Sequence, residues 1–173
     1  MGKIVLVGYM GSGKSSIGKI LADRLSLEFV DLDDLIVKET GKTIKEIFET
    51  DGEIYFRKLE HTVFKKQLLK KESFVLSLGG GTPCYAGNHL LLQQEDVLSV
   101  YLKASIDLLV TRLVKEADKR PLIANLNKEE MKEFVAKHLF DRNYYYNSCK
   151  KTISVDNKNL EEVCKELIAL YSK

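Results

Sequence analysis

The chain has 173 residues, of which 45% are hydrophobic, and this length and composition suit one domain with a single core. Its 27 basic and 25 acidic residues give a net charge of +2, which argues against a nucleic-acid or anionic-membrane partner. Three cysteines without C-x-x-C spacing argue against a disulfide framework and a zinc site, and the short apolar start, Ile4 to Val7, resembles no export signal. We therefore expect one domain over residues 1–173 in the cytoplasm. We also expect a monomer, although none of these observations fixes the oligomeric state.

The first predicted strand, Lys3 to Val7, runs directly into a glycine loop. The segment Gly8 to Ser15 reads G-Y-M-G-S-G-K-S and matches G-x-x-x-x-G-K-[ST]. A helix is predicted after it, because Ile17, Leu21 and Leu25 share one helical face. A strand before the loop and a helix after it are the context that a phosphate-binding loop requires.

This loop predicts ATP binding with Mg²⁺. Its backbone N–H groups and the positive end of the helix attract phosphate oxygens. Lys14 is expected to reach the β- and γ-phosphates, and the Ser15 hydroxyl to ligate Mg²⁺. The predicted nucleotide contacts in the loop are Gly11, Ser12, Gly13, Lys14, Ser15 and Ser16.

The second predicted strand, Leu27 to Val30, continues into the acidic segment Asp31 to Asp34. Strand alternation would place Asp31 and Asp33 on the same side. We expect Asp31 to face Mg²⁺ and Asp33 to face a substrate hydroxyl. The alternative for either acid is a helix N-cap.

The third predicted strand, Phe74 to Leu78, ends in Gly79, Gly80 and Gly81 without the acid that many phosphate-loop enzymes place there for magnesium. Asp31 is therefore the nearest candidate for that carboxylate. The three glycines are either a tight turn or a place where a ligand approaches bare backbone.

Two further strands are predicted, at Val97 to Leu102 and Thr152 to Val155. Capping-box patterns predict helix starts, namely Thr43 with Glu46, Asn127 with Glu130 and Asn159 with Glu162. The charged segment between Val114 and Asn127, which contains Arg120, is predicted to be a mobile loop. Five strands alternating with helices indicate an α/β fold with a parallel sheet and helices on both faces.

Arginine is scarce, with five residues among the 27 basic ones. Its planar fork grips carboxylates and phosphates in a bidentate way, so a lysine-rich chain is expected to use it where geometry matters. Arg24 is assigned to a surface ion pair. Neither His61, His89 nor His138 has ligand spacing, and the run Tyr144 to Tyr146 is interpreted as packing rather than as a stacking platform.

Taken in order, the motifs resemble the shikimate kinase family over nearly the whole chain. They are Gly8 to Ser15, Asp31-Leu32-Asp33, Phe56-Arg57-Lys58-Leu59-Glu60, Leu78 to Gly81, Arg120-Pro121-Leu122, and Arg142 before the tyrosines. The resemblance implies a three-layer αβα phosphate-loop kinase with a five-stranded parallel sheet. It also implies a helical substrate-binding insertion near residues 31–61 and a mobile lid near residues 113–126.

The resemblance also implies the roles of individual residues. Asp33 would hold the acceptor hydroxyls, while Arg57 and Arg142 would clamp the carboxylate of shikimate with help from the Gly79 to Gly81 backbone. Asp31 and Ser15 would hold Mg²⁺. Arg112 would lie near the adenine, and Arg120 on the lid would close over ATP, so the expected catalytic residues are Lys14, Asp33 and Arg120.

Two other functions remain open at this point. A gluconate kinase or a nucleoside monophosphate kinase has a similar architecture, although a nucleotide acceptor needs more phosphate-binding arginines than this chain offers. A nucleotide-gated binding protein without turnover is the alternative from a different class, and the pairing of Asp33 with Arg57 argues against it.

Overall fold

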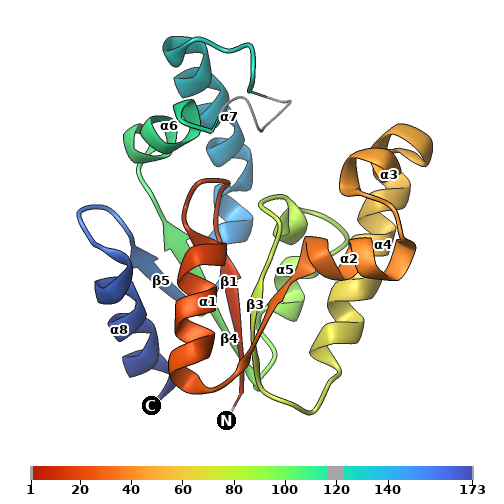
Figure 1. Cartoon of the computed structure of the whole chain (residues 1–173), viewed down its shortest axis with the longest axis vertical. Helices are drawn as coiled ribbons and strands as arrows, with labels where there is room; N and C mark the ends of the chain where they lie inside the picture. The colour runs from red at the N-terminus through yellow and green to blue at the C-terminus, as the bar shows by residue number, and fades with distance from the viewer. Residues whose placement is uncertain (1, 117–122, 173) are drawn as a thin grey trace.

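The computed structural model of the chain describes residues 2–116 and 123–172, and its centre is a sheet of five parallel strands (Figure 1). The spatial order of the strands is β2-β3-β1-β4-β5. Their bounds are β1 Lys3–Val7, β2 Glu28–Asp31, β3 Phe74–Ser77, β4 Val97–Lys103 and β5 Lys151–Ser154. All five predicted strands are confirmed, with ends shifted by at most one residue.

The middle of the sheet is the most buried part of the molecule. Every residue of β1 and β3 is buried, because helices cover both faces of the sheet. In the parallel pairing of these strands, Val5 of β1 lies opposite Leu76 of β3 and Ser99 of β4. The carboxyl ends of β1, β2 and β3 therefore meet along one edge of the sheet.

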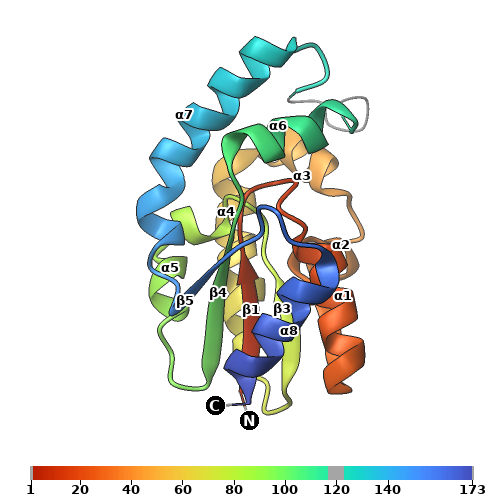
Figure 2. The ribbon, with the colours of Figure 1, turned by 90° about the vertical axis from the view of Figure 1, so that its left-hand side faces the viewer.

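Helices form the two outer layers (Figure 2). Figure 2 shows α1 and α8 on one face and α5 and the C-terminal part of α7 on the other. The helices are α1 Lys14–Leu25, α2 Leu32–Thr40, α3 Ile44–Thr50, α4 Gly52–Leu68, α5 Asn88–Leu91, α6 Ile106–Val114, α7 Lys128–Tyr146 and α8 Leu160–Tyr171, with a 3₁₀ turn, η1, at Thr82–Cys84. In Figure 1, α2, α3 and the start of α4 lie on one side of the phosphate loop, and α6 with the start of α7 lies on the other.

The predicted helix starts are confirmed in detail. At the beginning of α3, α7 and α8, the N-cap side chain accepts from the N3 backbone N–H, and the N3 glutamate accepts from the N-cap backbone. The predicted apolar face of α1 is also confirmed, since Ile17 and Leu21 on this face are fully buried. Local sequence patterns therefore define these helices correctly.

One sequence prediction is wrong in its reasoning. Strand β2 ends at Asp31, and α2 begins at Leu32, so strand alternation does not relate Asp31 to Asp33. Asp31 is instead the N-cap of α2, and its carboxylate accepts a hydrogen bond from the Asp33 backbone N–H at 3.0 Å. Leu32 is completely buried, and seating it in the core turns the chain from strand into helix at this point.

Within residues 2–116 and 123–172, no helix has the length and apolar character needed to cross a bilayer.

Candidate active site

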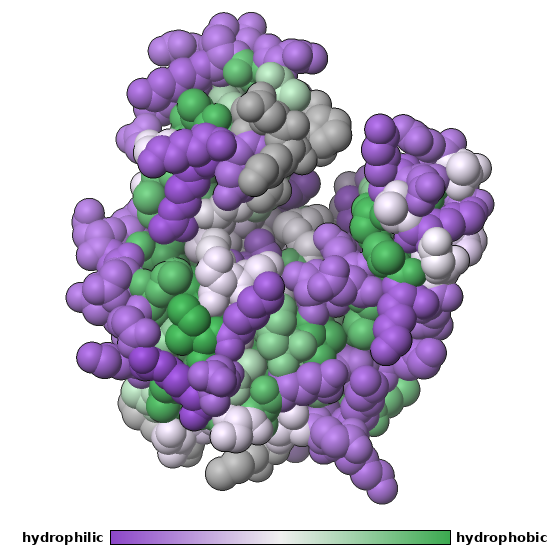
Figure 3. Space-filling view, in the orientation of Figure 1, coloured by the Kyte–Doolittle hydropathy of each residue, from purple (hydrophilic) through white to green (hydrophobic). Residues whose placement is uncertain are grey.

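A cleft of about 490 Å³ opens at the carboxyl ends of β1, β2 and β3, where parallel α/β sheets bind their ligands. Figure 3 shows the surface hollowed here, between the part that carries α6 and α7 and the part that carries α3. The cleft is lined by Met10, Gly11, Gly13, Lys14, Ser15, Ser16, Asp31, Asp33, Ser77, Leu78, Gly79, Gly80, Arg112, Glu116 and Leu160.

The phosphate loop forms the floor of this cleft. Gly11 and Gly13 have φ angles of 82° and 96°, which a side chain would strain, and Gly13 is the N-cap of α1. The ammonium of Lys14 donates to the carbonyl oxygens of Gly8 at 2.8 Å and Tyr9 at 3.0 Å. The backbone N–H groups at the start of α1 thus point to the space where a phosphate would lie.

Most of the predicted nucleotide contacts lie in this cleft. The exception in the loop is Ser12, which is buried and whose backbone N–H donates to the Tyr9 carbonyl oxygen at 3.1 Å. Arg112 reaches the cleft from α6 and donates to the Gly11 carbonyl oxygen at 2.9 Å. Leu160, at the first position of α8, lines the same cleft and was not predicted from the sequence.

Two side-chain oxygens that could hold a magnesium ion lie close together. The Ser15 hydroxyl donates to Asp31 Oδ2 at 3.3 Å, so the two oxygens are already about as far apart as neighbouring ligands of an octahedral ion. Among the described residues no cluster of three or more His, Cys, Asp or Glu side chains could hold a metal. Magnesium bound with nucleotide needs only one or two protein carboxylates because phosphates and water complete its shell, and the pair fits that need.

Asp33 lies in the first turn of α2 and has an unusual environment. Burial raises its pKa to about 6, with further contributions from the negative charges of Asp31 and Glu60, while Lys14 acts in the opposite direction. A carboxylate with this pKa accepts a hydrogen bond strongly and can exchange a proton near neutral pH. The arrangement suits a group that contacts a substrate hydroxyl.

Arg57, on α4, is held by several partners. Its Nη1 donates to Glu60 Oε2 at 3.0 Å, and the guanidinium carbon lies 4.0 Å from the ring centroid of Tyr85. Glu60 is only 1% exposed, and its other oxygen accepts from the Thr82 hydroxyl at 2.7 Å. Glu60 thus holds the guanidinium of Arg57 from three residues further along α4, and Thr82, which the sequence did not single out, holds Glu60.

The three glycines form a strip that separates charged side chains. A Cβ on Gly79 would lie 3.4 Å from Glu60 and 3.6 Å from Asp33, and one on Gly80 would lie 3.3 Å from Arg142 Nη1. A Cβ on Gly81 would meet Arg57 Nη2 at 2.9 Å. The glycines therefore allow charged side chains to approach the backbone closely, while the approach of a ligand to this backbone stays a prediction.

Arg142 approaches the strip from α7. Tyr146, one helical turn further on, donates its hydroxyl to the Gly80 carbonyl oxygen at 2.6 Å, and burial raises the pKa of this hydroxyl so that it stays protonated. The interpretation of the tyrosine run as packing is thus correct for the buried Tyr146. This residue also holds Gly80 in place through the hydrogen bond to its carbonyl oxygen. Its position four residues after Arg142 is the sequence signal that would have found it.

The structure brings together nearly all the predicted site residues. Asp33, Gly79 and Gly80 line the cleft, while Arg57, Gly81 and Arg142 lie immediately beside it, next to the glycine strip. Arg120 lies outside the described residues. Arg24 forms the expected surface ion pair, with Glu161.

Comparison with known proteins identifies relatives of the whole chain. Residues 10–172 match the family model described as shikimate kinase. A shikimate kinase of Flavobacterium psychrophilum is 58% identical over 167 residues, which cover 96% of this chain and 97% of that protein.

Solved structures agree with the sequence match. The crystal structure of shikimate kinase from Bacteroides thetaiotaomicron superposes with a TM-score of 0.91 at 30% identity and covers 99% of both chains. Shikimate kinase from Acinetobacter baumannii, solved in complex with shikimate, superposes with a TM-score of 0.86 at 31% identity over 99% of this chain and 93% of that one.

Proposed function

Since the chain belongs to the shikimate kinase family, we propose that it transfers the γ-phosphate of ATP to the 3-hydroxyl of shikimate, a step of aromatic amino-acid biosynthesis. The observation that carries the acceptor side is the glycine strip, which brings Asp33, Arg57 and Arg142 to neighbouring backbone positions. A carboxylate beside two guanidinium groups matches an acceptor that carries both hydroxyls and a carboxylate.

On the nucleotide side, we propose that Gly11 to Ser16 surround the phosphates of ATP. The positive end of α1 and the ammonium of Lys14 support this placement. Lys14 would exchange its bonds to the Gly8 and Tyr9 carbonyls for phosphate oxygens. Arg112 and Leu160, which line the same cleft, are the proposed neighbours of the adenine.

On the acceptor side, the carboxylate of shikimate is proposed to lie between Arg57 and Arg142, against the backbone of Gly80. Asp33 accepts a hydrogen bond from the attacking hydroxyl and orients it toward the γ-phosphate. Its raised pKa, about 6, lets it take the proton as the new O–P bond forms. In a loose transition state, orientation of the hydroxyl contributes more to the rate than a strong base does.

Catalysis by this site rests on position and charge. Phosphoryl transfer spreads negative charge over the γ-phosphate oxygens, and Lys14 is placed to stabilise that charge. Ser15 and Asp31 would hold Mg²⁺, which when bound neutralises phosphate charge. Arg120, within the lid predicted near residues 113–126, stays a prediction as a further cation over the phosphates.

We further propose that residues 1–173 act as one kinase domain whose acceptor region spans residues 31–61. A monomer suffices for the reaction as described, because every proposed contact comes from one chain. The cytoplasm, where ATP is available, is the proposed location, and the free thiols of Cys84, Cys149 and Cys164 agree with a reducing compartment.

Release of ADP in the presence of different acceptors tests this function. Wild-type protein with MgATP should release ADP readily with shikimate, and much more slowly with gluconate or a nucleoside monophosphate. Lys14→Met should reduce kcat on the order of 100- to 1000-fold while the thermal unfolding curve stays close to that of the wild type. Turnover of a nucleotide in preference to shikimate, or a fully active Lys14→Met protein, would reject the proposal.

A further inference from the structure

Tyr9 occupies a variable position of the phosphate-loop motif, yet it is only 1% exposed and contacts the acceptor side of the site. Its backbone carbonyl accepts from Lys14 at 3.0 Å, which ties its main chain to the nucleotide cleft. Its ring lies under the guanidinium of Arg142, with the guanidinium carbon 5.4 Å from the ring centroid. One residue thus contacts both halves of the site.

The hydroxyl of Tyr9 has a partner on the helix that carries Arg142. It lies 3.0 Å from Nδ1 of His138, one turn before Arg142 on α7, and the two rings meet edge to face with centroids 6.1 Å apart. Phe134 also packs against His138, at 4.2 Å between ring centroids. The imidazole is therefore held in one orientation.

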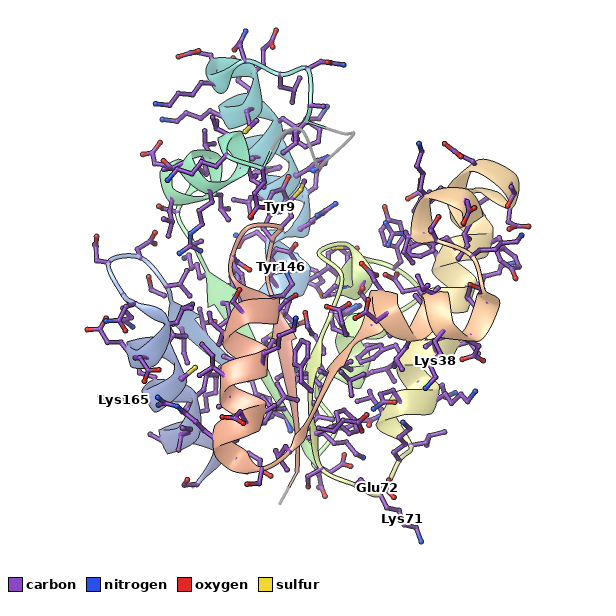
Figure 4. The ribbon with its side chains drawn as sticks, viewed as in Figure 1. Tyr9, Lys38, Lys71, Glu72, Tyr146 and Lys165 are labelled. Carbon is purple, nitrogen blue, oxygen red and sulfur yellow. The ribbon has the colours of Figure 1, made fainter. Side chains whose placement is uncertain are left out.

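The surroundings of Arg142 explain why such a support matters. The guanidinium lies against Gly80, with Nη1 3.3 Å from the position of an added Cβ, and it interacts with the Tyr146 hydroxyl. Figure 4 shows Tyr9 at the phosphate loop, with Tyr146 below it at the C-terminal end of α7. No salt bridge to a carboxylate of the described residues holds this guanidinium, in contrast to Arg57, which has Glu53 and Glu60.

The charge state of His138 agrees with this arrangement. Burial lowers the pKa of the imidazole, and the positive charge of Arg142 lowers it further. A neutral imidazole does not repel the nearby guanidinium, and its Nδ1 forms one hydrogen bond with the Tyr9 hydroxyl, as acceptor or donor according to the tautomer.

We propose that Tyr9 and His138 are positioning residues that hold the guanidinium of Arg142 in place for the carboxylate of the acceptor. The Tyr9 ring supports the guanidinium through a cation–π contact, and His138 fixes the ring through its hydroxyl. This inference rests on the proposed function, because it concerns the binding of the acceptor in that reaction. Neither residue touches the reacting atoms.

The test removes the hydrogen bond from either end. In Tyr9→Phe the ring remains and only the hydroxyl is lost, and in His138→Phe a phenyl ring replaces the imidazole and both ring nitrogens are lost. Each variant should raise KM for shikimate about 3- to 10-fold, the range expected for one neutral hydrogen bond, while KM for ATP changes less than about 2-fold. His138→Asn places an amide near the position of Nδ1 and should restore KM most of the way to the wild-type value.

Two comparisons separate positioning from general damage. The double variant Tyr9→Phe/His138→Phe should be no worse than either single variant, because both remove the same bond. Tyr171→Phe is the matched control, since it loses one tyrosine hydroxyl contact, to the Gly2 carbonyl oxygen at 3.2 Å, at the far end of the sheet. It should leave KM for shikimate unchanged.

The outcomes are distinct for the two proposals. If wild-type protein does not phosphorylate shikimate, the proposed function is rejected, and the inference fails with it. If wild-type protein is active but Tyr9→Phe and His138→Phe retain a normal KM for shikimate, the positioning role alone is rejected. A fall in kcat or in stability without a selective change of KM would likewise reject it in favour of a purely structural contact.

Discussion

At the scale of single residues, buried charged side chains of the site hold one another in fixed orientations. Arg57 is held by the buried carboxylate of Glu60, which is itself bonded to Thr82. A buried ion pair of this kind is costly to form and is retained where it fixes geometry, here the direction of a guanidinium fork. The guanidinium of Arg57, which we propose contacts the acceptor, is thus oriented by the protein itself.

Replacement of Arg57 by lysine tests the importance of the fork. Lysine keeps the charge but loses the planar face that lies on Tyr85 and the bidentate geometry for a carboxylate. We expect Arg57→Lys to raise KM for shikimate by about 10-fold or more, since one charge-assisted bond is lost, while KM for ATP stays near normal. Arg24→Lys is the matched control, because Arg24 makes only an exposed pair with Glu161. Normal use of shikimate by Arg57→Lys would contradict the carboxylate clamp.

Asp33 carries a stability cost that depends on pH. Its pKa of about 6 in the folded protein lies above the ordinary value of 3.8, so folding favours the protonated form. The stability contribution of Asp33 is fully present below about pH 4 and is lost as the pH rises through 6. At pH 8 the ionised side chain therefore destabilises the ligand-free protein.

Asp33→Asn should remove this penalty. Without nucleotide or magnesium, the variant should unfold at a higher temperature than the wild type at pH 8. The corresponding increase in the free energy of unfolding is on the order of 1–3 kcal/mol, and it should vanish near pH 4. Asp107→Asn should behave in the opposite way, because the pair with Lys132 lowers the pKa of Asp107. Thermal unfolding across this pH range measures both variants. An Asp33→Asn protein that is less stable than the wild type at pH 8 would contradict the expectation.

At the scale of elements, the sequence predicted what local patterns determine and missed what tertiary packing determines. The helices after Thr43, Asn127 and Asn159 follow from capping boxes, which are complete within four residues. For Asp31 the sequence left two alternatives, strand alternation and a helix N-cap, and the N-cap is correct. Local patterns did not decide between them, because the burial of Leu32 depends on a core formed by distant elements. The same limit applies to Thr82 and Leu160, whose roles arise only when distant elements meet.

The glycine strip shows how an element boundary serves the site. Gly81 precedes η1 with a φ of −89°, which alanine can adopt, so its lack of a side chain is a matter of space rather than of backbone freedom. The atoms that an added Cβ would meet belong to the end of the Arg57 side chain. The backbone can therefore tolerate the substitution while the guanidinium must move.

We expect Gly81→Ala to raise KM for shikimate several-fold while KM for ATP and the unfolding temperature change little. Gly80→Ala should have a smaller effect, because its Cβ would lie 3.3 Å from Arg142 Nη1 rather than the 2.9 Å found between Gly81 and Arg57. The effects of Gly81→Ala and Arg57→Lys should not add, since both displace the same cation. Independent, additive effects of these two substitutions would contradict this account.

At the scale of the whole molecule, the strand order explains why the two substrates meet. Because β3 lies between β1 and β2, the glycine strip after β3 is enclosed by the phosphate loop after β1 and by the acidic turn after β2. The sequence predicted a parallel sheet of five strands, but the spatial order of the strands is not a local property and was not predicted. Both chain ends lie at the opposite end of the sheet (Figure 1).

This arrangement predicts two different footprints in amide hydrogen exchange. MgADP should slow exchange in the phosphate loop, residues 8–16, because it immobilises the backbone N–H groups there. Shikimate should slow exchange in residues 52–61 and 79–82, which carry Arg57 and the glycine strip, and in the C-terminal part of α7. The segments 69–73 and 93–97, at the other end of the sheet, should exchange equally with and without either ligand.

In Arg57→Lys the shikimate footprint should weaken at a fixed subsaturating concentration of shikimate, while the MgADP footprint persists. Protection by shikimate that is confined to the phosphate loop would contradict separate sites for the two substrates and would place the acceptor in the nucleotide cleft instead.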